Sequence, residues 1–275
     1  MVCINRDLIV TGIPRGGTTL TAALVDSLSN SICLSEPDWQ VYWLRKTTNP
    51  NEITNLLTQD YVNLRKKVIN KMPIEDRRRP DGSTPTNYYS NDKKGKRIRG
   101  HGFSKQPTVF DMKNKDFLLG IKHCTLYSVI LPHLIKTNKF SILAVTRHPV
   151  PTLLSWNSVN KFCKNKVQLV ESHWPDLKKI IHSRDHKFNK QARIYDLYCR
   201  QYLQHQKDIQ LIKYEDLVKK PSILENITDR KLERTVEIKK STTNVNYDYS
   251  KVNDIKESLY KHAPHALKLY SLNEF

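Results

Sequence analysis

The chain has 275 residues, which is long enough for one large domain or two small ones, and 38% of them are hydrophobic, enough for a buried core. Its formal net charge of +19 predicts an anionic partner, such as a nucleotide cofactor, an anionic glycan, a nucleic acid or a membrane surface. A lysine-rich solvated surface would also explain part of this excess. No apolar run approaches the ~18–20 residues that a membrane-spanning helix needs.

The cysteines and the N-terminus bear on the compartment. The five cysteines are widely spaced and include no C-x-x-C pair, so they support neither a zinc site nor a disulfide framework. Only six residues precede the first expected strand, and we therefore expect no signal peptide. These features predict reduced thiols and a cytoplasmic protein.

The first expected unit is a strand, a glycine-containing loop and a helix, within residues 7–28. Apolar residues run from Leu8 to Val10, and after Thr18 they switch to helical spacing. The loop contains three of the chain's eight glycines, Gly12, Gly16 and Gly17. A strand, glycine loop and helix in this order place backbone N–H groups around a bound phosphate.

This loop lacks one residue of the nucleotide-triphosphate P-loop. Gly12 and Gly17 have the spacing of G-x-x-x-x-G-K-[ST], and Thr19 supplies the final hydroxyl. Thr18 replaces the lysine that reaches the β- and γ-phosphates, so triphosphate chemistry is poorly supported. Arg15 instead brings a cation into the loop. An ordinary strand-to-helix turn is the alternative, but it does not require this combination.

Further apolar runs predict buried strands at residues 31–35, 117–121, 140–146 and 209–214. Helical spacing is found within 40–74, at about 126–135 and 189–206, and at 252–272 with an interruption near Pro264. Strands that alternate with helices predict an α/β fold with a mainly parallel sheet.

Residues 75–107 differ in composition from the rest of the chain. Apolar residues are few there, and glycine, proline and asparagine are frequent. The cations of this stretch are Arg77, Arg78, Arg79, Lys93, Lys94, Lys96, Arg97, Arg99 and Lys105. This composition predicts a long basic surface insertion within a single domain that covers residues 1–275.

The loop sequence resembles a known family. Pro14-Arg15-Gly16-Gly17-Thr18-Thr19-Leu20 is similar to the 5′-phosphosulfate loop of sulfotransferases that use 3′-phosphoadenosine 5′-phosphosulfate (PAPS), whose pattern is Pro-Arg/Lys-Ser-Gly-Thr-Thr. Gly16 departs from the common serine, which removes one hydroxyl near the sulfate. The resemblance implies a three-layer α/β fold similar to that of P-loop NTPases. It also implies that the PAPS-binding residues include Arg15, Gly16, Gly17, Thr18 and Thr19, and that no metal is required.

A second motif corresponds to the other phosphate of PAPS. Arg147-His148-Pro149 ends an expected strand, and Ser155 follows eight residues after the arginine. Sulfotransferases bind the 3′-phosphate with an arginine and a serine at similar spacing, so the resemblance implies this role for Arg147 and Ser155. A surface arginine and a helix-face serine are the alternative.

Two later segments resemble family segments that contact the cofactor. Lys213-Tyr214-Glu215-Asp216-Leu217 is similar to the segment near the adenine, which implies that Tyr214 lies against the base. The weaker match at residues 240–242 implies a contact from Ser241, although a polar loop explains it equally well.

Three residues after expected strands are candidates for the chemistry. In the tyrosylprotein and carbohydrate branches of the family, which this chain resembles most, a glutamate in the position of Glu36 is the general base. The alternative is a solvent-exposed carboxylate. Lys122 resembles the lysine that, with Arg15, stabilises the transferring sulfuryl group. Cytosolic small-molecule sulfotransferases use a nearby histidine base, but His123 is adjacent to Lys122 and should point the other way along a strand, which makes it the weaker candidate.

These motifs occur in the family's order and predict an enzyme that transfers a sulfuryl group from PAPS to an acceptor hydroxyl and releases PAP. One alternative is a Mg-ATP-dependent small-molecule kinase, which should need the missing loop lysine. Another is a basic nucleic-acid-binding protein, for which no recognised motif is present. The basic 75–107 stretch predicts an anionic glycan or an acidic peptide as the acceptor.

Overall fold

The computed structural model describes residues 6–91, 97–99, 103–159, 170–238 and 244–274. Within them, five strands form one sheet: β1 (Asp7–Gly12), β2 (Ser31–Ser35), β7 (Leu118–Lys122), β8 (Ser141–Thr146) and β9 (Gln210–Lys213). Their order across the sheet is β2-β7-β1-β8-β9. Each of these pairings is parallel, which confirms the predicted sheet.

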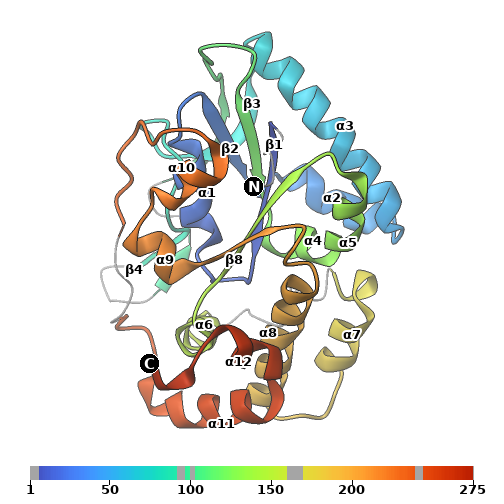
Figure 1. The fold of residues 1–275 in the computed structure, drawn as a ribbon, viewed down its shortest axis with the longest axis vertical. Helices are drawn as coiled ribbons and strands as arrows, with labels where there is room; N and C mark the ends of the chain where they lie inside the picture. The colour runs from blue at the N-terminus through green and yellow to red at the C-terminus, as the bar shows by residue number, and fades with distance from the viewer. Residues whose placement is uncertain (1–5, 92–96, 100–102, 160–169, 239–243, 275) are drawn as a thin grey trace.

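Helices cover both faces of this sheet, because successive residues of each buried strand point to opposite faces. Leu8 and Val10 of β1 pack with α1 (Thr18–Asp26), α9 (Tyr214–Lys219) and α10 (Ile223–Thr228). Ile9 points to the other face, toward a larger core that includes α3 (Pro50–Ile69), α4 (Cys124–Val129) and α5 (Leu131–Thr137). The two cores give the predicted three-layer α/β architecture (Figure 1).

Five further helices cover one end of the molecule. They are α6 (Pro149–Asn157), α7 (Pro175–Ile181), α8 (Lys187–Gln204), α11 (Val252–His262) and α12 (Pro264–Leu269), which gather in the lower half of Figure 1. Single 3₁₀ turns occur at Glu171–His173, Tyr249–Lys251 and Leu272–Glu274. No helix in the described part of the chain combines the length and apolarity that crossing a membrane requires.

One predicted helix is divided in the structure. The stretch expected at about 126–135 forms α4 and α5, with Ile130 at the break. The reason is Pro132, which has no backbone N–H and whose ring excludes the carbonyl of Ser128 from its usual helical position. The side-chain amide of Gln201 donates a hydrogen bond to that Ser128 carbonyl instead.

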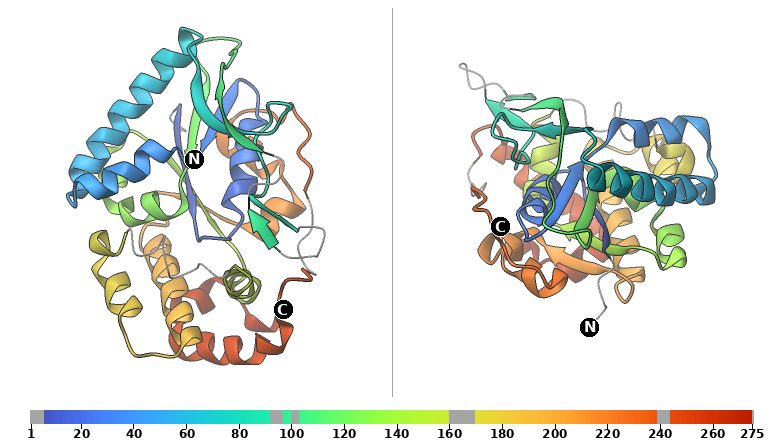
Figure 2. Two further views of the ribbon diagram at one scale, coloured as in Figure 1. Left: turned by 180° about the vertical axis from the view of Figure 1, so that it is seen from behind. Right: turned by 90° about the horizontal axis from the view of Figure 1, so that it is seen from above.

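Residues 75–107 contain more regular structure than their composition suggests. β3 (Ile74–Arg78) pairs antiparallel with β6 (Ser104–Thr108), and β4 (Tyr89–Asn91) pairs antiparallel with β5 (Arg97–Arg99). The β3–β6 ribbon and α3 lie at the end of the molecule opposite α11 (Figure 2). Lys93, Lys94 and Lys96 lie outside the described residues.

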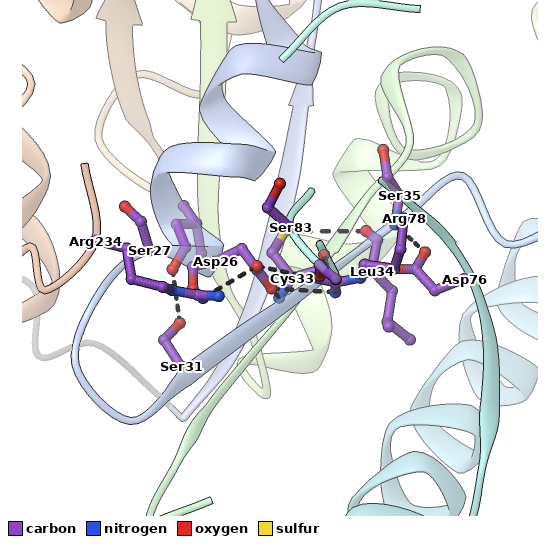
Figure 3. A network of polar contacts seen from close by, with 12 residues as sticks. Asp26, Ser27, Ser31, Cys33, Leu34, Ser35, Asp76, Arg78, Ser83 and Arg234 are labelled. Carbon is purple, nitrogen blue, oxygen red and sulfur yellow. Dashed lines mark hydrogen bonds and ion pairs between the residues drawn. The ribbon is translucent and has the colours of Figure 1, made fainter. Parts of the chain in front are cut away.

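The first residues of this stretch, at β3, include two buried charged side chains, Asp76 and Arg78. Arg78 is 2% exposed, and its guanidinium donates to the carboxylates of Asp76 at 2.8 Å and Asp26 at 2.7 Å (Figure 3). Arg234 also contacts Asp26, at 3.1 Å. Asp76 and Arg78 share one face of β3 because they are two residues apart. Their pairing satisfies charges that would otherwise be buried without a partner.

Candidate active site

The parallel sheet brings the predicted site residues to one edge. The carboxyl ends of parallel strands meet at the same side of a sheet, where ligands of α/β folds bind. The strand order β2-β7-β1-β8-β9 therefore sets the order of the residues that follow each strand. Along this edge they are Glu36, Lys122, the 13–17 loop, Arg147 and Tyr214.

The loop after β1 depends on its glycines. Gly17 has φ of 97°, and a Cβ there would lie 2.2 Å from Cδ2 of Tyr214. At Gly16 a Cβ would lie 2.7 Å from the carbonyl oxygen of Ile13, which accepts a hydrogen bond from the Gly16 N–H at 2.8 Å. A side chain at position 16 would therefore require this turn to shift.

We expect the Gly17→Ala variant to be less stable than the wild type by about 2–5 kcal/mol, because left-handed backbone and steric overlap with Tyr214 both disfavour it. Gly82→Ala is the matched control: Gly82 has φ of 79°, but a Cβ added there would meet no atom within 4 Å. Its free energy of unfolding should fall by only about 1–2 kcal/mol, which is the cost of a left-handed backbone conformation. Urea unfolding measures both. Equal losses would contradict the close packing of Tyr214 on the loop.

Arg15 is held on two sides. Its Nε donates to Oγ of Ser155 at 3.1 Å, and its Cζ lies 4.5 Å from the centroid of the Tyr89 ring. Its backbone is also left-handed, with φ of 67°, an uncommon conformation for a residue with a side chain. Ser155 therefore contacts the loop arginine in this structure, whereas the sequence motif pairs it with Arg147.

A cavity beside the loop, here called the loop cavity, contains most of the predicted cofactor residues. Gly17, Thr18, Thr19, Arg15, Arg147 and Tyr214 line it, together with Thr86, Asn87, Glu237, Asn244 and Tyr247. Sequence reasoning does not find the second set, because these residues belong to no recognisable motif. Ser241 lies outside the described residues.

Tyr214 lies between two groups at the edge of this cavity. Arg147 Cζ is 4.8 Å from the centroid of its ring, and the ring also packs against Gly17. Burial raises the pKa of the Tyr214 hydroxyl, and the nearby Arg147 cation only partly offsets that rise. The ring thus holds the loop and the arginine in place, a packing role that the motif alone did not predict.

Hydrogen bonds fix the turn that carries Arg147. Glu215 accepts a hydrogen bond from the backbone N–H of His148 at 2.9 Å, and the hydroxyl of Tyr195 donates to the carbonyl of Arg147. Trp156 donates from its indole N–H to the carbonyl of Pro14 at 2.7 Å, which ties α6 to the loop. The turn after β8 and the turn after β1 are therefore held together.

Glu36 and Lys122 form a buried ion pair at the other end of the edge. Oε1 of Glu36 lies 2.9 Å from Nζ of Lys122, and the two side chains are 9% and 2% exposed. Glu36 has φ of 51°, and its backbone N–H donates to the carbonyl of Lys122 at 2.8 Å. Burial lowers the pKa of Lys122, but the carboxylate of Glu36, together with Tyr88 and Cys124, more than offsets this, so the pKa lies above its ordinary value. The lysine is therefore a permanent cation at this position.

A second cavity of about 450 Å³, here called the Glu36 cavity, opens beside this pair. Its wall is one face of α2 (Asp38–Lys46), where Asp38, Val41, Tyr42 and Arg45 are spaced three or four residues apart. The other face of α2 is anchored to α3: Trp39 and Gln40 both donate to the carboxylate of Asp60 at 2.9 Å.

The charges that line the Glu36 cavity are of both signs: the carboxylates of Glu36 and Asp38, and the guanidinium groups of Arg45 and Arg77. The carboxylate of Asp38 pairs with both Arg77 and Lys105. The exposed guanidinium of Arg45 adds a further positive charge at the rim. Val41, Leu44 and Val170 give the walls apolar surface. The cavity therefore combines apolar walls with charged groups of both signs.

His123 also lines this cavity, which corrects the expectation that it points away from the site. It is the N-cap residue of α4, and its Nδ1 accepts a hydrogen bond from the backbone N–H of Leu126 at 3.2 Å. Leaving the strand at Lys122 ends the alternation of side chains on which the expectation relied. Cys124 lies on the same side, with Sγ 3.6 Å from Oε1 of Glu36. In the described residues, no group of three or more His, Cys, Asp or Glu side chains is placed to hold a metal ion.

Comparison with known proteins identifies the family of this chain. The family described as "Sulfotransferase domain" matches residues 5–255 of the chain. That range includes all five strands of the sheet and the residues of both cavities. Curated proteins and solved structures gave no significant match. Because the match covers most of the chain, this protein belongs to the sulfotransferase family.

Proposed function

We propose that this protein transfers the sulfuryl group of PAPS to an acceptor hydroxyl and releases PAP. The observation that carries the proposal is the arrangement of two cavities along one edge of the sheet, with the loop and Arg147 at one and the Glu36–Lys122 pair at the other. A donor bound at the loop and an acceptor bound near Glu36 would then meet at the cations between them.

The donor side provides groups for both phosphates of a 3′,5′-bisphosphate. Backbone N–H groups of residues 17–19 lie at the start of α1 and suit the 5′ end, whereas the N–H of Gly16 donates to the carbonyl of Ile13. Arg147 lines the same cavity and is proposed to bind the 3′-phosphate together with Ser155, whose Oγ accepts a hydrogen bond from Arg15 in this structure. Each charged hydrogen bond contributes roughly 1.5–3 kcal/mol. ATP has no 3′-phosphate, so this second anchor favours PAPS over ATP.

On the acceptor side, Glu36 is the proposed general base. It removes the proton of the acceptor hydroxyl, whose oxygen attacks sulfur as the bond to the leaving phosphate breaks. Lys122 and Arg15 stabilise the negative charge on the sulfuryl oxygens and on that phosphate as fixed cations. The Nδ1 atom of His123 accepts a hydrogen bond, so in the neutral ring the proton is on Nε2. Such an imidazole has no nitrogen left to accept the substrate proton, which supports Glu36 over His123.

The Glu36 cavity favours an acidic peptide over an anionic glycan as the acceptor. Its apolar walls can bury a hydroxyl-bearing side chain, and Arg45 can pair with a neighbouring carboxylate. A sugar presents few apolar groups to such walls. A screen with labelled PAPS across acidic peptides, glycans and small alcohols tests this choice.

We also propose a cytoplasmic location, which is supported by Cys33 and Cys199, whose buried thiols form no disulfide.

Calorimetry with PAP tests the donor assignment. We expect PAP to bind in the presence of EDTA, and Arg147→Ala to weaken it about tenfold to a hundredfold, the equivalent of one charged contact. Arg200→Ala is the matched control, since Arg200 pairs with Asp176 on the helical end of the molecule. Tighter binding of Mg-ATP or of a random oligonucleotide than of PAP would overturn the proposal.

A further inference from the structure

The 79–89 segment, which leads from β3 into β4, connects the two cavities at the carboxyl edge of the sheet. At the end of β3, Arg77 lines the Glu36 cavity. Further along, Thr86 and Asn87 line the loop cavity. The two residues that follow, Tyr88 and Tyr89, each place a ring against one of the cations assigned to the sulfuryl group.

Tyr88 contacts the acceptor side. It is 5% exposed, and the centroid of its ring lies 5.1 Å from Nζ of Lys122. Its hydroxyl donates to Oγ of Ser35, the residue before Glu36. A cation within about 6 Å of a ring face is attracted by the ring, and more strongly where water is excluded. The Tyr88 ring therefore restrains the Lys122 ammonium in addition to its ion pair with Glu36.

Tyr89 contacts the donor side. The centroid of its half-buried ring lies 4.5 Å from Cζ of Arg15. The ring and the hydrogen bond from Arg15 Nε to Ser155 restrain the plane of the guanidinium from two directions. Adjacent tyrosines thus contact two cations from different parts of the edge, one at the end of β7 and one in the loop after β1.

The segment is anchored firmly enough to hold these rings. Arg78, immediately before it, is buried between the carboxylates of Asp26 and Asp76 (Figure 3). Within the segment, Arg79 donates to Oγ1 of Thr86 at 3.0 Å. A segment fixed at its base and braced internally loses little conformational entropy when a substrate binds.

We propose that Tyr88 and Tyr89 are positioning residues, which orient Lys122 and Arg15 for sulfuryl transfer and couple the donor and acceptor sites through one segment. This inference rests on the proposed function, because it takes its reaction from there. It differs from the role that the charges of the basic 75–107 stretch suggest, which is to bind the acceptor. Here two neutral aromatic residues of that stretch act on the cations of the core.

Tyr89 is tested through the donor. Tyr89→Leu should raise KM for PAPS and Kd for PAP about 3- to 30-fold, the range that a cation–π contact supplies, and Tyr89→Phe should restore both. In an Arg15→Ala background, Tyr89→Leu should have little further effect, because the ring acts through the guanidinium. Additive effects of the two substitutions would overturn the assignment.

Tyr88 is tested through the chemical step. Tyr88→Leu should lower kcat about 3- to 30-fold and change Kd for PAP less than twofold, whereas Tyr88→Phe should retain most of kcat. If Tyr88→Leu does not fold, the kcat of Tyr88→Phe and the KM values of the Tyr89 variants still test the proposal. Phe variants as defective as the Leu variants would show that the hydroxyls matter and not the rings.

Tyr260→Leu is the matched control, because Tyr260 is 56% exposed on α11, away from both cavities. It should change neither KM nor kcat. Wild-type protein that fails to bind PAP or to transfer a sulfuryl group would refute the proposed function itself. If the wild type is active but Tyr88→Leu and Tyr89→Leu each change KM and kcat by the same factor, only the positioning role is refuted.

Discussion

Glu36→Gln is expected to lower kcat for sulfuryl transfer by about 10²–10⁴, the usual contribution of a general base. Glutamine keeps the size and the backbone position of Glu36 but cannot take the proton of the acceptor. Because Glu36 lines the acceptor cavity and not the loop cavity, Kd for PAP should change less than about twofold. Single-turnover transfer from labelled PAPS at saturating acceptor separates the two effects.

His123→Asn is the control that distinguishes the two base candidates. The asparagine oxygen can still accept the hydrogen bond from the Leu126 N–H that caps α4, so the local fold is kept. We expect this variant to retain most of kcat. If His123→Asn loses activity and Glu36→Gln does not, the base is the histidine.

Arg78→Met is expected to destabilise the protein by about 3–5 kcal/mol, the cost of leaving buried charges without their partner. Asp26 and Asp76 contact this guanidinium with side chains that are 3% and 2% exposed. The exposed pair of Lys113 with Glu233 gives the control, and Lys113→Ala should cost at most about 1 kcal/mol. Urea unfolding at neutral pH measures both variants.

The loss in Arg78→Met should also depend on pH. Burial raises the pKa of Asp76 above its ordinary value, although the Arg78 cation lowers it in part. Without Arg78 the folded-state pKa rises further, so the folded variant holds a proton that the unfolded chain releases as the pH increases. Its stability therefore falls as the pH rises toward that pKa, and the loss relative to wild type should be smaller at pH 5 than at pH 7. A loss that is independent of pH would contradict the pairing.

The sequence alone predicted which residues meet at the carboxyl edge of the sheet, for a physical reason. Glu36, Lys122 and Arg147 each follow a short apolar run, and strands that alternate with helices must lie parallel, so their carboxyl ends meet. Local periodicity thus determined the fold and the order of these residues. It could not predict the break at Ile130, because one proline inside a helical pattern left the position of the break open.

Tertiary structure decided the contacts that no local pattern records. The charged stretch 75–107 has the composition of a surface insertion, yet Arg78 is buried because Asp26, 52 positions earlier, lies beside it. Tyr88 and Tyr89 have no motif, and only the path of the 79–89 segment brings them to Lys122 and Arg15. Sequence periodicity determines which side chains share a strand or helix face, whereas contacts between distant segments depend on how those faces pack.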